Sequence, residues 1–153
     1  MRAHISGACF ALAVVAGPAA LMSAADRAAA FGALAIGETG NIAKGGVAAG
    51  ASRNYANKDA AEARALKECL SFPDAPAATR AKCRIVASFE KRCYAAALDP
   101  KAGTPGFGWA VRASRTIAES AAMDDCRDTA GKRRAKFCKV TMIACDETNS
   151  RSQ

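Results

Sequence analysis

The amino-acid sequence predicts an α+β domain made of two degenerate strand-strand-helix-strand repeats and stapled by disulfide bonds. Three observations lead to this fold class: similar segments recur in the same order, cysteines occupy matching places in the two copies, and strand-type and helix-type patterns alternate within each copy. The chain has 153 residues, a size typical of one domain. We expect an exported domain over residues 26–146, with copies at about 31–92 and 93–145.

The repeat is visible as matched segments whose offset falls along the chain. At an offset of 62, Gly46-Val47-Ala48 lies over Gly108-Trp109-Ala110. The offset then drops to 57, which places five extra residues (NYANK) between the second strand and the helix of the first copy. The further matches are FGALAIG (31–37) over CYAAALD (93–99), ASR (51–53) over ASR (113–115), DAAEARALKEC (59–69) over TIAESAAMDDC (116–126), and CRIV (83–86) over CKVT (138–141).

In the first copy, short apolar runs predict strands at 33–36 and 46–51, separated by the turn sequence GETG. A helix is predicted over 58–70, because alanine, leucine and cysteine recur there at helical spacing and Asn57 is a suitable N-cap. In the second copy, Ser114 takes the N-cap position. The final strands are predicted at 83–89 and 138–144, which are rich in β-branched residues. The segment containing Pro73 and Pro76 is predicted to be a loop.

The N-terminal segment has the features of a cleavable signal peptide. Arg2 precedes an apolar run over 8–21, and Ser23-Ala24-Ala25 supplies the small residues of a cleavage site. The run is shorter than the roughly 20 apolar residues that a membrane span needs. We therefore expect residues 1–25 to be removed, the mature protein to lie in the periplasm or outside the cell, and the polar tail 147–153 to be disordered.

Removal of the leader would take Cys9 away and leave an even set of cysteines, which in a short exported domain predicts disulfides. Six cysteines allow 15 connectivities. The repeat favours pairs that tie each helix end to the following strand, and the last pair is then expected to link the two copies. The expected disulfides are Cys69–Cys83, Cys126–Cys138 and Cys93–Cys145.

The expected mature chain has no histidine, because His4 lies in the leader. This excludes Ser-His and Cys-His nucleophilic catalysis within the chain, and any histidine-ligated metal. We predict no metal site and no cofactor. The glycines at 103, 106 and 108 precede an expected strand, so they do not form a nucleotide-binding fingerprint.

Basic residues gather in the two helix-to-strand loops. Without the leader the chain keeps 21 basic and 14 acidic residues, a net charge of about +7. Such a charge speaks to partners and solubility rather than to fold. One interpretation is a solvated loop; the other is a surface that binds an anionic polymer. The candidate anion-binding residues are Arg80, Lys82, Arg84, Lys132, Arg133, Arg134, Lys136 and Lys139.

Two other groups of residues allow a functional and a structural interpretation. Glu62 and Glu119 are repeat equivalents, and would form an acid–base pair if the helices faced a shared groove. Solvated helix positions explain them equally, and we favour that interpretation; Asp124 and Asp125 are likewise assigned to the surface. Trp109, with Phe107, would make either a binding platform or part of the core, and we favour the core.

The chain resembles a family of exported bacterial proteins, domain of unknown function 4189. The resemblance covers residues 31–146 and rests on FGALAIG, on GFGWA followed by a helix, and on CRIVASFEKRCYAAAL. It implies export and paired cysteines, and it brings no established activity. Two departures from the family are Val47, where an aromatic is usual, and the longer loop over 71–82.

These observations favour a non-enzymatic binding or interaction protein that engages anionic envelope or host components. Its partner is either an anionic polymer or a protein. The alternative is a small secreted hydrolase that uses carboxylates, or an inhibitor of a hydrolase. No residue is assigned a catalytic role.

Overall fold

The computed structural model describes residues 30–146; the expected leader and the expected tail lie outside this range. The chain forms two three-stranded antiparallel sheets, ordered β2-β1-β3 and β5-β4-β6, and each carries one long helix. The elements are β1 (Phe31–Glu38), α1 (Ile42–Gly45), β2 (Val47–Tyr55), α2 (Lys58–Leu70), α3 (Ala77–Arg80), β3 (Arg84–Glu90), β4 (Cys93–Leu98), β5 (Phe107–Arg112), α4 (Arg115–Ala130), the 3-10 turn η1 (Ala135–Phe137) and β6 (Lys139–Cys145).

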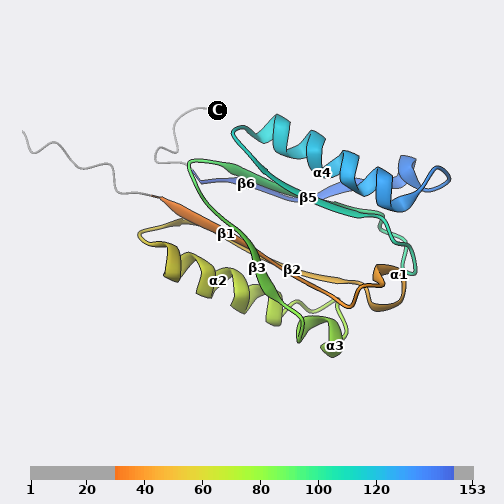
Figure 1. The fold of residues 1–153 in the computed structure, drawn as a ribbon, viewed down its shortest axis with the longest axis horizontal. Coiled ribbons are helices and arrows are strands. Elements are labelled where there is room, and N and C mark those ends of the chain that lie inside the picture. The colour runs from red at the N-terminus through yellow and green to blue at the C-terminus, as the bar shows by residue number, and fades with distance from the viewer. Residues whose placement is uncertain (1–29, 147–153) are drawn as a thin grey trace, which may run out of the picture.

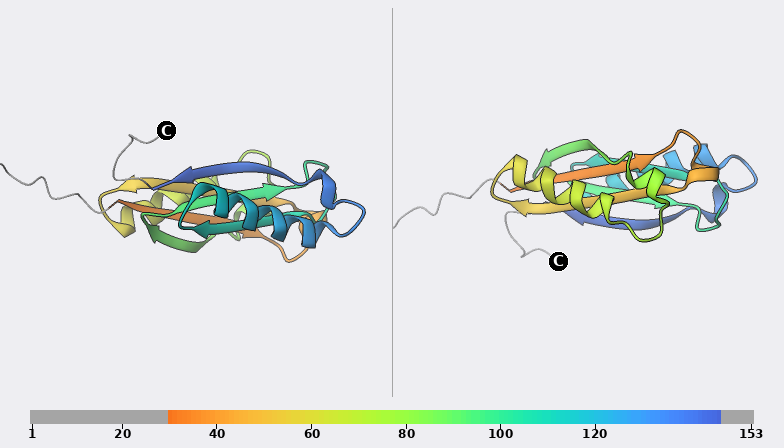
Figure 2. Two further views of the ribbon diagram at one scale, coloured as in Figure 1. Left: turned by 90° about the horizontal axis from the view of Figure 1, so that it is seen from above. Right: turned by 90° about the horizontal axis from the view of Figure 1, so that it is seen from below.

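The two sheets pack face to face, with one helix on each outer surface (Figure 1). Views from above and below show α4 over one sheet and α2 over the other (Figure 2). The first half (residues 31–92) and the second half (residues 93–145) therefore have the same topology, a strand hairpin, a covering helix and a returning edge strand. This confirms the predicted α+β architecture of two strand-strand-helix-strand units.

Residue size sorts the two faces of each central strand. On β1, Ala33 and Ala35 face α2, whereas Leu34 and Ile36 belong to the core between the sheets. On β4 the small residues again lie under the helix, and the side chain of Tyr94 enters the core between the sheets. Because successive strand residues point to opposite faces, this alternation gives each sheet a thin interface with its helix and a thicker one with the other sheet.

One glycine in each half allows its helix to lie very close to the sheet. A Cβ atom added at Gly50 would collide with the backbone of Ala65 and Cys69, and one at Gly108 would collide with the backbone of Ala122 and Cys126. Gly50 is paired with Ala35 of β1, and Gly108 with Ala97 of β4. Gly50 and Gly108 are therefore structural equivalents.

This equivalence corrects the sequence alignment of the second strands. Similarity between the segments matches Gly46 to Gly108 and places the extra residues of the first half between strand and helix. The strand register shows instead that the β1–β2 connection is four residues longer than the β4–β5 connection, and it contains α1. The close helix–strand contact decides the register, and that contact is not visible as similarity between short alanine-rich segments.

The predicted helix starts are confirmed, and the short elements are additions. The Asn57 side chain accepts a hydrogen bond from the Ala60 N–H at 2.8 Å, and the Ser114 hydroxyl accepts one from the Ile117 N–H at 3.4 Å. Helix α3, after Pro76, occupies part of the predicted loop. Helices of one turn are too short to produce a helical pattern, which is why α1 and α3 were not predicted.

The structure contains the three predicted disulfides. Cys69–Cys83 and Cys126–Cys138 each tie the end of a helix to the residue before the next strand, with Cα–Cα distances of 5.9 and 6.1 Å. The third bridge, Cys93–Cys145, was expected to link the two copies, and this expectation is wrong. It crosses between the neighbouring strands β4 and β6 of the second sheet, where the two Cα atoms are 3.8 Å apart.

The two halves are thus joined by packing, by the chain itself and by polar contacts, and no disulfide within residues 30–146 crosses between them. One such contact lies at the end of the domain where β1 begins. The Asp146 carboxylate accepts a hydrogen bond from the Asn54 N–H at 2.6 Å, and its own N–H donates to the Arg92 carbonyl at 2.8 Å. Burial raises the pKa of Asp146.

Candidate functional site

Both helix-to-strand connections lie at the same end of the molecule, opposite the start of β1 (Figure 1). We call this the loop end; it comprises residues 39–46, 71–83, 99–106 and 131–138. The first connection, with α3, lies on one side of this end, and the second connection, with η1, lies on the other. All eight candidate anion-binding residues therefore lie at the loop end or next to it, with Arg84 and Lys139 at the first positions of β3 and β6.

In the first connection, the three candidate residues Arg80, Lys82 and Arg84 lie in different surroundings. Arg80 donates hydrogen bonds to the carbonyls of Ala75, at 2.9 Å, and Phe72, at 3.4 Å. This guanidinium therefore closes the loop rather than facing a partner. Arg84 is exposed but lies beside carboxylates in a groove described below, whereas Lys82 is an exposed cation away from that groove.

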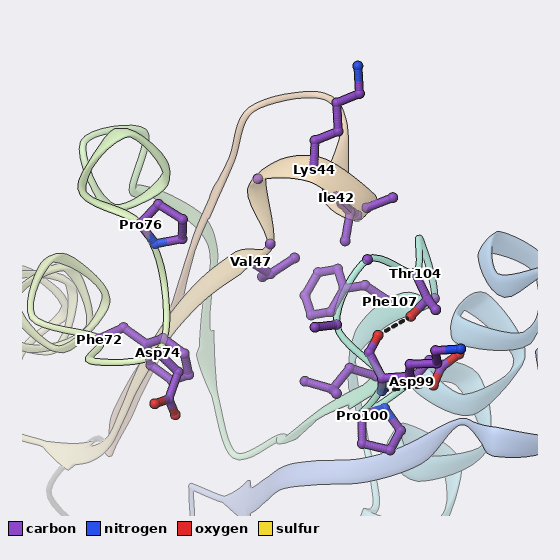
Figure 3. A pocket seen from close by; sticks show the side chains of 18 residues that line it. Ile42, Lys44, Val47, Phe72, Asp74, Pro76, Asp99, Pro100, Thr104 and Phe107 are labelled. Carbon is purple, nitrogen blue, oxygen red and sulfur yellow. Dashed lines mark hydrogen bonds between the residues drawn. The ribbon is translucent and has the colours of Figure 1, made fainter.

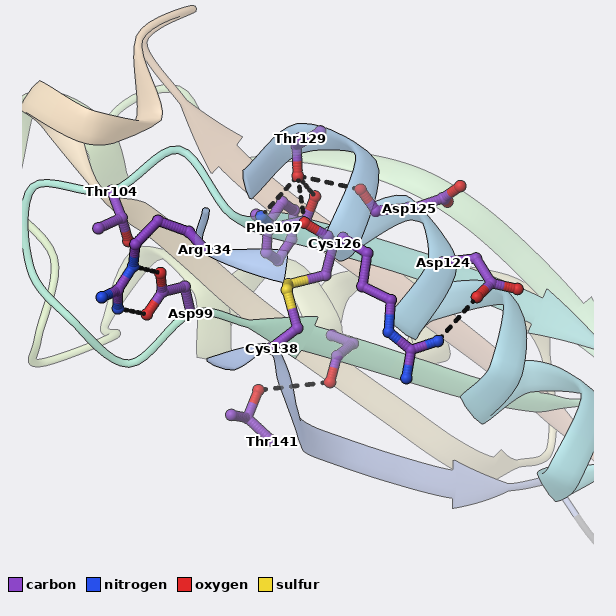
Figure 4. The surroundings of a disulfide bond; sticks show 12 residues. Asp99, Thr104, Phe107, Asp124, Asp125, Cys126, Thr129, Arg134, Cys138 and Thr141 are labelled. Atoms are coloured by element: carbon purple, nitrogen blue, oxygen red, sulfur yellow. Dashed lines mark hydrogen bonds and ion pairs between the residues drawn. A yellow bond between two sulfur atoms is a disulfide. The ribbon is translucent and has the colours of Figure 1, made fainter. Parts of the chain in front are cut away.

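In the second connection, Arg134 forms an internal ion pair. Its guanidinium donates two hydrogen bonds to Asp99, both at 2.6 Å, and the Asp99 side chain is fully buried (Figure 4). The same guanidinium lies 4.2 Å from the ring centroid of Phe137. The hydrogen bonds from Arg134 lower the pKa of Asp99 to about 2 despite its burial. Arg134 therefore anchors this connection to the β4–β5 turn, and it is not available to a ligand.

The remaining basic residues of the second connection are exposed. Lys132, Arg133, Lys136 and Lys139 form no ion pair within the described residues. The backbone that carries them is held by the Cys126–Cys138 bridge and by η1. We call residues 132–139 the basic turn. Because these internal contacts hold the backbone in place, binding through the exposed charges would require little ordering of the chain.

A cleft opens at the loop end beside the Asp99–Arg134 ion pair, which anchors the basic turn. Its volume is about 510 Å³, and α1, residues 72–76 and the β4–β5 turn line it. Figure 3 shows that Val47 and Phe107 lie at its centre, with Asp74 and Asp99 at opposite sides and the Lys44 ammonium pointing away. The cleft is mainly apolar inside, and its cations lie at the rim.

The carboxylates Glu62 and Glu119 do not share a groove. They lie on α2 and α4, the helices on opposite outer surfaces of the domain (Figure 2). Glu62 accepts a hydrogen bond from the Ser88 hydroxyl and pairs with Lys58 at 3.5 Å. The Ser88 hydrogen bond is the main cause of its lowered pKa. The acid–base pair considered from the sequence is therefore wrong, because two carboxylates must flank one bond to act on it.

Trp109 has features of both roles considered for it. It packs against the core between the sheets, yet it is only partly buried and lines a second groove. The sequence analysis singled out this tryptophan and assigned Asp125 to the surface, but it did not single out Glu38 or Asp128. Glu38 reaches this groove when the two sheets pack, and Asp125 and Asp128 reach it when α4 packs on its own sheet.

Within residues 30–146, no group of three histidine, cysteine or acidic side chains is placed to hold a metal ion. None of the described helices is both long and apolar enough to span a membrane.

Comparison with known proteins gives a family but no characterised relative. The chain matches no curated protein and no solved structure. The family described as Domain of unknown function (DUF4189) matches residues 31–145, which is nearly the whole of the two-sheet domain. The chain therefore belongs to the DUF4189 family.

Proposed function

We propose that this protein is an exported, non-enzymatic binding protein that attaches to anionic polymers through the basic turn. The single observation that carries the proposal is the group of four exposed cations, Lys132, Arg133, Lys136 and Lys139, none of which forms an ion pair within the described residues. Lys101, on the neighbouring β4–β5 turn, adds a fifth exposed cation. A polyanion that neutralises such a group releases its counterions, which supplies binding energy without requiring a particular ligand sequence.

Export is the other part of the proposal. Three disulfides in one small domain are typical of oxidising compartments such as the periplasm or the extracellular space. Export with cleavage after Ala25 would start the mature chain at Asp26 and remove Cys9, leaving the six cysteines of the three disulfides. N-terminal sequencing of protein recovered from the periplasm or the medium tests this step, and recovery of intact Met1 in the membrane fraction would contradict it.

Binding is tested by salt titration with heparin and, separately, with duplex DNA. The variant neutralises three residues of the basic turn, K132Q/R133Q/K136Q, and leaves Arg134 in place. Binding by the natural protein should weaken linearly on a log–log plot against salt concentration, and for DNA each lost phosphate contact should reduce the slope by about 0.9. The variant should bind more weakly and with a shallower slope.

A matched control removes the same number of charges elsewhere. R53Q/R92Q/R115Q neutralises three exposed residues away from the loop end, so net charge changes equally in the two variants. The control should keep nearly all of the binding. Equal losses in both variants would show that only net charge matters, and absence of binding at low ionic strength would refute the proposal.

A further inference from the structure

A second groove lies at the open edge between the two sheets, and we call it the edge groove. It has a volume of about 420 Å³. Edge strand β3 of the first sheet forms one side, and edge strand β5 of the second sheet forms the other, next to the last turns of α4. The side chains that matter most here are Glu38, Arg84, Val86, Trp109, Asp125 and Asp128.

The four charged side chains and the indole of the edge groove have no internal partners, whereas the Thr129 hydroxyl bonds to backbone atoms. Within the described residues, the side chains of Glu38, Arg84, Asp125 and Asp128 form no ion pair and no hydrogen bond. The indole N–H of Trp109 also donates to no acceptor there, and it is not among the buried atoms that lack a partner. The groove therefore presents a free donor, a guanidinium, three carboxylates and an aromatic ring to solvent.

Comparison of the two halves shows that the fold does not require this set. Trp109 pairs with Ala96 on the central strand, and at the equivalent position of the first half Ala51 pairs with Leu34. An alanine therefore suffices at this place in the sheet. A tryptophan here contributes an aromatic surface that the first half lacks.

The helix residues beside the groove also differ between the two halves, and again the second half has the groups that are free to bind a ligand. Glu68 is the first-half counterpart of Asp125, and it forms an ion pair with Arg64 on its own helix. Ser71 is the counterpart of Asp128, and its hydroxyl bonds to the Lys67 carbonyl. In the first half these side chains are satisfied locally, whereas in the second half both carboxylates remain free beside the groove.

We propose that the edge groove binds a neutral saccharide. A sugar ring has an apolar C–H face that packs on an aromatic ring, and a rim of hydroxyls that both donate and accept hydrogen bonds. Trp109 supplies the ring; the carboxylates accept from hydroxyls, and Arg84 and the indole N–H donate to them. Three carboxylates oppose an anionic ligand, and Arg84 opposes an organic cation at the same place. This site is separate from the basic turn and does not depend on the function proposed for it.

Trp109 is the only tryptophan of the chain, so its fluorescence reports on this groove alone. The probes are the neutral trisaccharides chitotriose, cellotriose and maltotriose, titrated into the full mature chain with its disulfides intact. At least one of them should produce a saturable change in intensity or wavelength. The affinity should not change with salt concentration, unlike binding through the basic turn.

The variant D125N/D128N keeps the size of both side chains and removes both charges. It should weaken binding by about tenfold or more, because hydrogen bonds to charged groups are the stronger ones. The matched control is D124N, one residue away on α4, where the carboxylate pairs with Arg127 and does not line the groove. The control should bind like the natural protein, and unchanged near-ultraviolet circular dichroism should show that both variants fold.

Three results would overturn the proposal. The first is a flat fluorescence titration with all three trisaccharides at millimolar concentrations. The second is equal affinity in D125N/D128N and the natural protein, which would place any sugar elsewhere. The third is a response to spermidine that the neutral sugars do not reproduce, which would make this a site for organic cations.

Discussion

The two halves of the domain share one topology but are stabilised differently at the loop end. In the first half, Arg80 closes the connection by hydrogen bonds to backbone carbonyls, and α1 extends the β1–β2 connection. In the second half, an ion pair between the buried Asp99 and the partly exposed Arg134 anchors the connection, and a cross-strand disulfide joins β4 and β6 at the opposite end of the sheet. The second half therefore combines a connection anchored by an ion pair with the larger number of exposed cations. This combination suits a surface that must present charge in a fixed arrangement.

Removal of the third disulfide, Cys93–Cys145, should cause the largest loss of stability. C93S/C145S leaves each half with one helix-to-strand bridge. In the chain-entropy model the loss is about 4 kcal/mol for a closed loop of this length, against about 3 kcal/mol for C69S/C83S or C126S/C138S. Urea unfolding of the three variants measures these losses. A smaller loss for C93S/C145S than for the other two would show that this bridge constrains the unfolded chain less than its loop length predicts.

Adding a methyl group at Gly50 or at Gly108 should cause the next largest loss of stability. G50A and G108A each force a helix away from its sheet, because the added carbon meets helix backbone rather than a movable side chain. Overpacking of this kind costs about 1–3 kcal/mol. Similar losses in thermal unfolding for both variants would support the structural equivalence of the two glycines. A loss in one variant only would show that the helices do not approach their sheets equally.

The ion pair of the second half should have a smaller effect that depends on pH. The pKa of Asp99 is about 2 in the folded protein, below its ordinary value of 3.8. The pair therefore stabilises the protein above about pH 4, and this contribution is lost as the pH falls from 4 towards 2. R134Q should lower the melting temperature at pH 7 and lose less further stability over that acid range.

The control for this prediction is R133Q, the neighbouring exposed arginine of the basic turn. R133Q should leave both the melting temperature and its pH dependence nearly unchanged, because exposed charges contribute little to stability. If R134Q and R133Q behave alike, the Asp99–Arg134 pair does not anchor the connection.

The sequence predicted the parts of this fold that depend on local patterns. The helix over 58–70 with its Asn57 cap was predicted with the correct bounds, and the aligned cysteines led to the correct pairing. The partner strand of Cys93 was missed, because Cys93 and Cys145 become neighbours only through the order of strands in the second sheet.

Candidate site residues were predicted less well than the fold. Charge and position in the chain identified the basic residues, but they do not reveal that Arg134 pairs with a buried carboxylate 35 residues away. The edge groove combines residues from β1, β3, β5 and α4, and no local pattern connects them. These features depend on contacts between elements that are far apart in the chain. No regular spacing of residues in the sequence indicates such contacts.

The most direct test of the account is to map heparin binding on the two halves by amide chemical shifts in nuclear magnetic resonance. We expect heparin to bind at the basic turn of the second half. The largest shift changes should therefore lie in residues 132–139, with much smaller ones in the corresponding first-half segment 77–84. Changes of equal size in the two segments, or changes confined to other parts of the domain, would contradict it.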